Sequence, residues 1–365
     1  MTIESRPRGE IQSLQVLRAV AAGMIALGHL DNYAIPIYLT KGFSWIGVDI
    51  FFVLSGFIVA YTFQPYMQQQ GAWWLFLKKR ASRIFPFYWV ACLFALLVAA
   101  LTGYKADLPF DQIIASFALF PQKIGEQLIP VAWTLNYEWL FYGITAMILL
   151  IAPRHFARFC WVWLLVILVV QPFATLEPRP YFSWTMYFGN LYQFEFLCGI
   201  YAGYAYLGKA WMPRFSNRQL TGLSLWYLLL IVAALVYGYY TIDHPQKFGH
   251  YSIFTLRCLL LGFAFAFIIY ALAELERRGA LPAFPRWSLT IGGASYVLYL
   301  LHDMIFVLLG TAWQALFGQA PNQGSAIAIL AYCLVATVVV IAVSVWATRC
   351  IERPLTRGCK KLIRA

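Results

Sequence analysis

Apolar stretches of about 20 residues, the length that one helix needs to cross a bilayer, recur along this chain of 365 residues. Apolar residues make up 62% and charged residues 12%, against roughly 45–50% and 25% in soluble domains. The pattern predicts an all-α, polytopic transmembrane helix bundle that forms one domain over residues 1–365. About ten spans are expected: 12–33, 43–63, 84–102, 131–152, 159–174, 186–207, 220–240, 251–273, 291–314 and 325–348.

The segment 110–130 is only moderately apolar and is interrupted by Pro121 and Pro130. We therefore expect an interfacial or re-entrant piece there instead of an eleventh crossing. Glycines 42, 47 and 56 are expected to let helices approach closely.

Lysine and arginine fall unevenly on alternate sides of these spans. With ten spans, 21 of the 27 basic residues lie on one side, five lie on the other and Arg257 lies within a span. Because cytoplasmic loops carry the excess of basic residues, both termini are predicted to be cytoplasmic, with short tails at about 1–11 and 349–365. The net charge of +12 is then explained by anionic membrane lipids, and no nucleic acid partner is expected.

The seven cysteines occur singly, without the spacing of a metal site or a disulfide framework. No metal is therefore predicted.

The first span carries two basic side chains on one helical face. Arg18 and His29 are eleven residues apart, which is almost three turns and about 16 Å along a helix. Arg18 is expected near the cytoplasmic edge and His29 near the outer edge, so the pair marks a path across the membrane. The alternative is structural: Arg18 extends to the headgroups and His29 caps the helix.

Asp49, in the second span, is expected at a depth similar to that of His29. Its carboxylate can orient the imidazole and stabilise the protonated form. A structural hydrogen bond to a neighbouring helix is the alternative.

Arg80 and Arg83 follow two lysines just before the third span. Three residues apart on one helical face, their guanidinium groups can grip phosphates bidentately, so a soluble phosphorylated donor in the cytoplasm is the predicted ligand. A purely topogenic role is the alternative.

Glu138 lies among aromatic residues in the fourth span, with Trp133, Tyr137 and Tyr142 near it in sequence. Aromatic faces stack on sugar rings, and a desolvated glutamate is suited to proton transfer. These residues are therefore candidates for an acceptor site.

His302, followed by Asp303, lies in the ninth span and is a candidate catalytic residue or an interhelical donor. Glu195 and Arg257, in the sixth and eighth spans, are candidates for a buried pair.

Taken together, these segments resemble the integral membrane family called acyltransferase 3. Five stretches carry the resemblance over nearly the whole chain: Arg18 through His29, Gly47 through Phe57, Arg80 to Pro86, Trp133 to Tyr142, and Ser295 through His302. The tail from Ile351 to Leu355 agrees with the usual ending of the family.

The resemblance implies transfer of an acyl group, most often acetyl from acetyl-CoA, to a hydroxyl of an exported or lipid-linked glycan. No permanently bound cofactor is implied. His29 becomes the leading catalytic residue, Arg18, Arg80 and Arg83 contact the donor, and Glu138 is a further site residue. Residues 11–18 are most similar to members that modify exopolysaccharides, including cellulose-type polymers. The resemblance also implies a location in a bacterial inner membrane and, as partner, a glycan synthase or export complex.

Two mechanisms are compatible with this arrangement. His29 acts as a general base on the sugar hydroxyl, or it accepts the acyl group and relays it outward. Two other classes of function are open at this point: a proton-coupled transporter or flippase of glycan precursors, and a structural partner of a glycan synthase.

Overall fold

The computed structural model describes residues 9–34, 38–63, 69, 71–176, 184–242 and 250–364. These residues form helices, and no strand occurs among them, which confirms the all-α class. The α-helices are α1 Gln12–His29, α2 Tyr38–Phe63, α3 Ala72–Thr102, α4 Phe110–Phe117, α5 Trp133–Ile151, α6 Phe156–Leu176, α7 Trp184–Phe188, α8 Tyr192–Tyr206, α9 Asn217–Ile242, α10 His250–Arg277, α11 Arg286–Phe317, α12 Ala326–Ala347 and α13 Arg353–Arg364.

Nine of the ten expected spans each coincide mainly with one helix, whereas the sixth, 186–207, is divided between α7 and α8, with residues 189–191 between them. Within the described residues, seven helical segments are long and apolar enough to cross a membrane: Ser44–Phe63, Ala72–Thr102, Pro130–Ile151, Pro153–Phe173, Thr255–Arg277, Arg286–Phe317 and Ala326–Leu362. Among the others, α8 has 15 residues, fewer than the roughly 20 that a full crossing needs. The count of ten crossings and the side of the termini stay predictions.

Between the third and fourth expected spans lies α4, a helix of eight residues. At 1.5 Å per residue, α4 is about 12 Å long. It is too short to cross a bilayer, in agreement with the expectation for segment 110–130.

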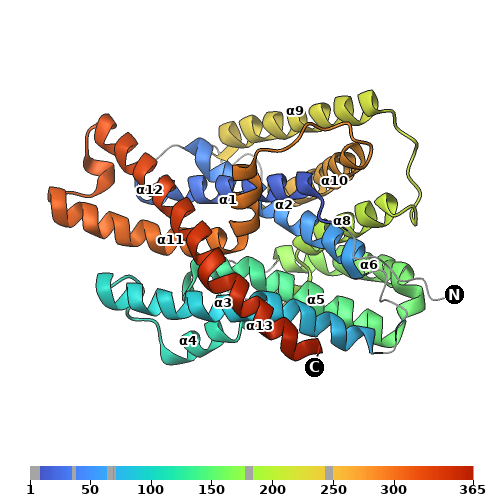
Figure 1. The fold of residues 1–365 in the computed structure, drawn as a ribbon, viewed down its shortest axis with the longest axis horizontal. Coiled ribbons are helices and arrows are strands. Elements are labelled where there is room, and N and C mark those ends of the chain that lie inside the picture. The colour runs from blue at the N-terminus through green and yellow to red at the C-terminus, as the bar shows by residue number, and fades with distance from the viewer. Residues whose placement is uncertain are drawn as a thin grey trace.

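Helix α3 begins at Ala72, twelve residues before the expected span. Arg80 and Arg83 therefore lie within a continuous helix. The expected C-terminal tail is helical as well: α13 crosses in front of α3 in Figure 1 and packs against it.

Helices α1 and α2 occupy the middle of the bundle (Figure 1), with α1 packed against α2, α10 and α11. A Cβ atom on Gly47 of α2 would lie 2.6 Å from the Ala21 carbonyl oxygen of α1. One on Gly56 would lie 2.0 Å from the Phe196 carbonyl oxygen of α8. The predicted close approach is confirmed at these two glycines, while the surroundings of Gly42 lie outside the described residues.

The contact between α2 and α8 uses glycine on both helices. A Cβ atom on Gly199 of α8 would lie 2.0 Å from the Val53 carbonyl oxygen. Backbone atoms cannot yield locally to such an overlap, so any side chain at Gly199 must push the helices apart.

We predict that Gly199→Ala destabilises the protein by about 1–3 kcal/mol, the range for overpacking. The matched control is Gly143→Ala in α5, where an added Cβ meets nothing within 4 Å. Because alanine favours helix more than glycine does, this control is expected to gain about 0.5–1 kcal/mol. Thermal unfolding in detergent measures both, and equal melting temperatures would contradict the predicted contact.

Candidate active site

A pocket in the middle of the bundle collects polar side chains from α1, α2, α3, α5 and α11. Its polar lining consists of Arg18, Ser55, Arg83, Thr134, Glu138, Ser295, Tyr296 and Tyr299. Three of the sequence-predicted site residues, Arg18, Arg83 and Glu138, thus line one pocket although more than 50 residues separate each from the next.

Glu138 is held in this pocket by two hydroxyl groups. Ser55 of α2 donates a hydrogen bond to Glu138 Oε1 at 3.0 Å, and Tyr142 donates to the same oxygen from one turn further along α5. The carboxylate therefore has a fixed orientation towards the pocket.

Arg18 and Arg83 lie within electrostatic range of each other and of Glu138. Neither makes an ion pair within 4.0 Å among the described residues. Two cations beside one carboxylate leave the pocket with an excess positive charge at membrane depth, which is the environment for an anionic ligand.

Arg80 lies in a different place from Arg83, one helical turn further along α3. It is buried, its guanidinium carbon lies 5.4 Å and 5.2 Å from the ring centroids of Phe76 and Tyr142, and Nη2 donates to Thr62 Oγ1 at 3.2 Å. Arg80 therefore lies behind the pocket and supports Tyr142, whereas Arg83 lines the pocket itself.

His29 and His302 meet beside the pocket. Their ring centroids are 4.9 Å apart with an edge-on geometry, and Tyr299, which lines the pocket, lies 6.1 Å from the His302 ring. The sequence placed both histidines inside the membrane but did not predict that they would be neighbours.

The hydrogen bonds of both histidines fix the same tautomer. Nδ1 of His29 lies 2.8 Å from the Ile25 carbonyl oxygen, and Nδ1 of His302 lies 3.1 Å from the Leu298 carbonyl oxygen. Because a carbonyl only accepts, Nδ1 carries the proton in each neutral ring and Nε2 presents its lone pair. His302 Nε2 is buried and has no hydrogen-bond partner in the described part of the chain.

Asp49 has a partner other than the one predicted for it. Arg257 of α10 binds its carboxylate, with Nε 3.3 Å from Oδ2 and Nη2 3.4 Å from Oδ1, and also donates to the Tyr192 hydroxyl at 2.9 Å. The structure thus shows the bond to a neighbouring helix that was the structural alternative, since a buried carboxylate needs a compensating cation. The interpretation that Asp49 orients His29 stays a prediction.

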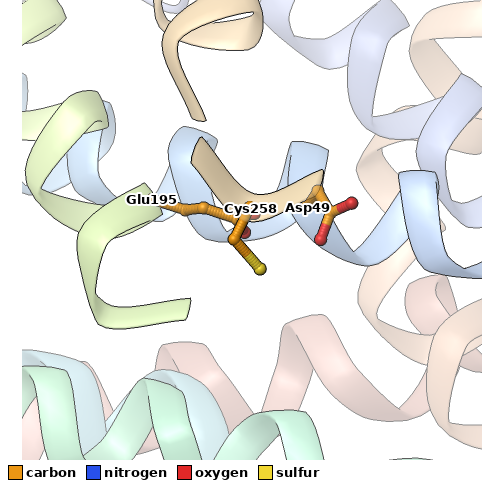
Figure 2. Close-up of side chains that lie close together, drawn as sticks. All are labelled: Asp49, Glu195 and Cys258. Carbon is orange, nitrogen blue, oxygen red and sulfur yellow. The ribbon is translucent and has the colours of Figure 1, made fainter. Parts of the chain in front are cut away.

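Glu195 and Cys258 complete this second cluster, and Figure 2 shows them with Asp49 between α2, α8 and α10. Donor atoms of the three side chains lie within 4.8 Å of one another. Carboxylates and a thiol are chemically able to hold a metal ion, but the Arg257 guanidinium already compensates Asp49. The expectation that no metal is bound stays a prediction.

The aromatic residues predicted to bind substrate divide between two places. The Trp133 ring lies 5.8 Å from Trp45 and 5.4 Å from Tyr192, and the Tyr137 ring lies 5.7 Å from Tyr192. These rings form an aromatic cluster at the start of α5, close to Arg257. Tyr142 instead belongs to the support of Glu138.

Comparisons with known proteins identify the family of the chain. Residues 11–346 match the family model described as an acyltransferase domain. The chain belongs to the acyltransferase 3 family. It is therefore a membrane protein and an acyltransferase. The two other classes that the sequence left open, a transporter and a structural partner, do not describe the activity of this family.

This member of the acyltransferase 3 family is 27% identical over 319 residues to the exopolysaccharide production protein ExoZ of Rhizobium meliloti (strain 1021). The match covers 85% of this chain and 89% of the relative. No solved structure matches the chain.

Sequence reasoning missed several residues of this acyltransferase pocket, in particular Thr134, Ser295 and Tyr299. A signal for the last two was present, because Ser295, Tyr299 and His302 are spaced i, i+4 and i+7 and so share one face of α11. Small hydroxyl residues are common in membrane helices, so their spacing becomes informative only once His302 is known to face the site.

We predict that Asp49→Ala destabilises the protein by about 3–5 kcal/mol, because the Arg257 charge would remain buried without its partner. The control is Glu126→Ala, which removes an exposed ion pair to Lys123 that contributes about 0–1 kcal/mol. Thermal unfolding and the yield of folded protein measure both. A folded Asp49→Ala variant with normal stability would refute the structural role.

Proposed function

We propose that this acyltransferase moves an acyl group, acetyl in the simplest case, from cytosolic acyl-CoA to a hydroxyl of an exported or lipid-linked polysaccharide. The observation that carries the proposal is the pocket in which Arg18 and Arg83, which make no ion pair among the described residues, lie beside Glu138. Tyr299 of this pocket lies 6.1 Å from His302, the neighbour of His29. One end suits a phosphorylated donor and the other supplies a base.

The donor side is argued from charge. A CoA thioester carries phosphates and a thioester on one flexible arm, and guanidinium groups bind phosphate oxygens through paired N–H donors. Arg83 of α3 and Arg18 of α1 both lie in stretches predicted to be near the cytoplasm, and both line the pocket. An arginine without a protein partner in a pocket of this kind is available for such a ligand.

The acceptor side is argued from the histidines. His29 Nε2 can take the proton of a sugar hydroxyl while the hydroxyl oxygen attacks the thioester carbonyl carbon. The carbon–sulfur bond then breaks, and the departing thiolate takes up the proton. Alternatively, His29 Nε2 attacks the thioester carbonyl carbon first, and CoA leaves as the thiolate. The sugar hydroxyl oxygen then attacks the acyl carbon, the bond to Nε2 breaks, and the hydroxyl proton passes to the thiolate. In both routes, His302 and Tyr299 restrict the orientation of the His29 ring, and no permanently bound cofactor takes part.

The proposed acceptor, a polysaccharide, is argued from the related protein and from the aromatic residues. The related protein of Rhizobium meliloti is named for exopolysaccharide production. We propose the same role for this chain, with cellulose-type polymers included among the acceptors. The cluster of Trp133 and Tyr137 offers flat faces on which sugar rings stack. We place the enzyme in a bacterial inner membrane as a multi-pass protein that works beside a glycan synthase or export complex.

His29→Ala is expected to lower the ester content of the exported polysaccharide about 100-fold or more, the contribution of a general acid–base group. The amount of polymer exported should not change. His155→Ala, which removes an exposed histidine, is the control and should leave both quantities normal. Continued acylation in the His29→Ala variant would eliminate the catalytic assignment.

Arg83→Gln is expected to raise KM for acyl-CoA by about 10- to 100-fold, since a hydrogen bond to a charged group contributes about 1.5–3 kcal/mol. Arg83→Lys should recover only part of this loss, because an ammonium group cannot bind phosphate through a planar fork. Arg218→Gln changes an exposed arginine of α9 outside the pocket lining and serves as the control. Steady-state kinetics with varied acyl-CoA would measure all three, and an unchanged KM for Arg83→Gln would exclude the donor contact.

A further inference from the structure

Ser295 of α11 is a buried residue of the pocket whose hydroxyl group has no partner. Its side chain is 0% exposed, it lines the pocket with Arg18 and Glu138, and Oγ makes no hydrogen bond within the described residues. A buried hydroxyl without a hydrogen bond is unfavourable by about 1–3 kcal/mol, so its partner should be sought outside the protein.

Other hydroxyl residues of the same helix show what a structural role looks like. Ser288 donates to the Pro285 carbonyl oxygen at 2.8 Å, Thr290 to Arg286 at 2.8 Å and Thr311 to Val307 at 3.0 Å. Such bonds to the preceding turn are the ordinary solution for a hydroxyl in an apolar helix. Ser295 lacks this bond.

The position of Ser295 limits the chemistry of its ligand. Ser295 and His302 are seven residues apart on one face of α11, which corresponds to about 10 Å along the helix. Helices α1 and α11 pack in parallel: Gln15 contacts Gly292 near the beginning of both helices, and His29 contacts His302 further along. Ser295 therefore lines the pocket at a depth between the N-terminal ends of α1 and α11 and the two histidines, where the thioester would react.

We infer that Ser295 donates a hydrogen bond to an amide carbonyl oxygen of the pantetheine arm of the acyl donor. The inference rests on the proposed function, in which the thioester reaches His29 while the phosphates stay near the arginines. The arm between these two ends is neutral and carries amide groups, which are acceptors that match a hydroxyl donor. Ser295 is thus a positioning residue that aligns the donor along the pocket.

Ser295→Ala should weaken binding of CoA by about 2- to 12-fold, because a neutral hydrogen bond contributes about 0.5–1.5 kcal/mol. The variant should be as stable as the parent protein or more so, since the change removes a buried hydroxyl that lacks a partner. Binding is measured by calorimetry on the purified full chain in detergent, and stability by thermal unfolding.

The chain offers a matched control in Ser344→Ala. Ser344 of α12 is also 0% exposed with an Oγ that has no partner among the described residues, but it does not line the pocket. Its substitution should have the same neutral or stabilising effect on unfolding and no effect on CoA binding.

Pantetheine, which has the arm without the phosphates, is the second probe. Ser295→Ala should weaken pantetheine and CoA by a similar factor, whereas Arg83→Gln should weaken only CoA. If the parent protein binds CoA and Ser295→Ala binds it equally well, the role of Ser295 is refuted while the proposed function stands. If the parent protein binds neither probe, both proposals are overturned.

Discussion

The parallel packing of α1 against α11 is the contact on which the site depends. Near one end, a Cβ atom on Gly292 would lie 2.0 Å from the Gln15 carbonyl oxygen, so only glycine lets the backbones approach this closely. Near the other end, the His29 and His302 rings are 4.9 Å apart. The approach at the glycine therefore brings the two histidines together, and the polar faces of both helices border the same region.

Charge inside the bundle follows a simple division between paired and unpaired groups. Asp49 is paired with Arg257, and Glu274 with Arg277 and Arg278. These pairs connect or stabilise helices, because an uncompensated charge at such depth is unfavourable.

Two cations that make no ion pair among the described residues lie in the pocket. Arg18 and Arg83 remain without an ion-pair partner within the described residues, although Glu138 is nearby. Ser55 and Tyr142 hold Glu138 by hydrogen bonds, which orients the carboxylate without neutralising it. The pocket therefore keeps the positive charge that an anionic donor requires.

The sequence alone determined the all-α class, the nine of ten apolar segments that each coincide with one helix, and three polar residues of the pocket, Arg18, Arg83 and Glu138. Hydrophobic periodicity and the cost of burying charge are local properties, so they can be read one segment at a time. The spacing of Arg18 and His29 on one helical face is of this kind, since both lie on α1.

Only the tertiary structure decided which polar residues share a site. Asp49 was the partner predicted for His29, whereas in the structure the packing of α1 against α11 brings His302 to His29, and α10 supplies Arg257 to Asp49. The structure was likewise needed to identify Ser295 as a candidate, because a hydroxyl group without a partner can be recognised only when its neighbours are known. Partner choice between helices depends on contacts between distant segments, and no local pattern in the chain records it.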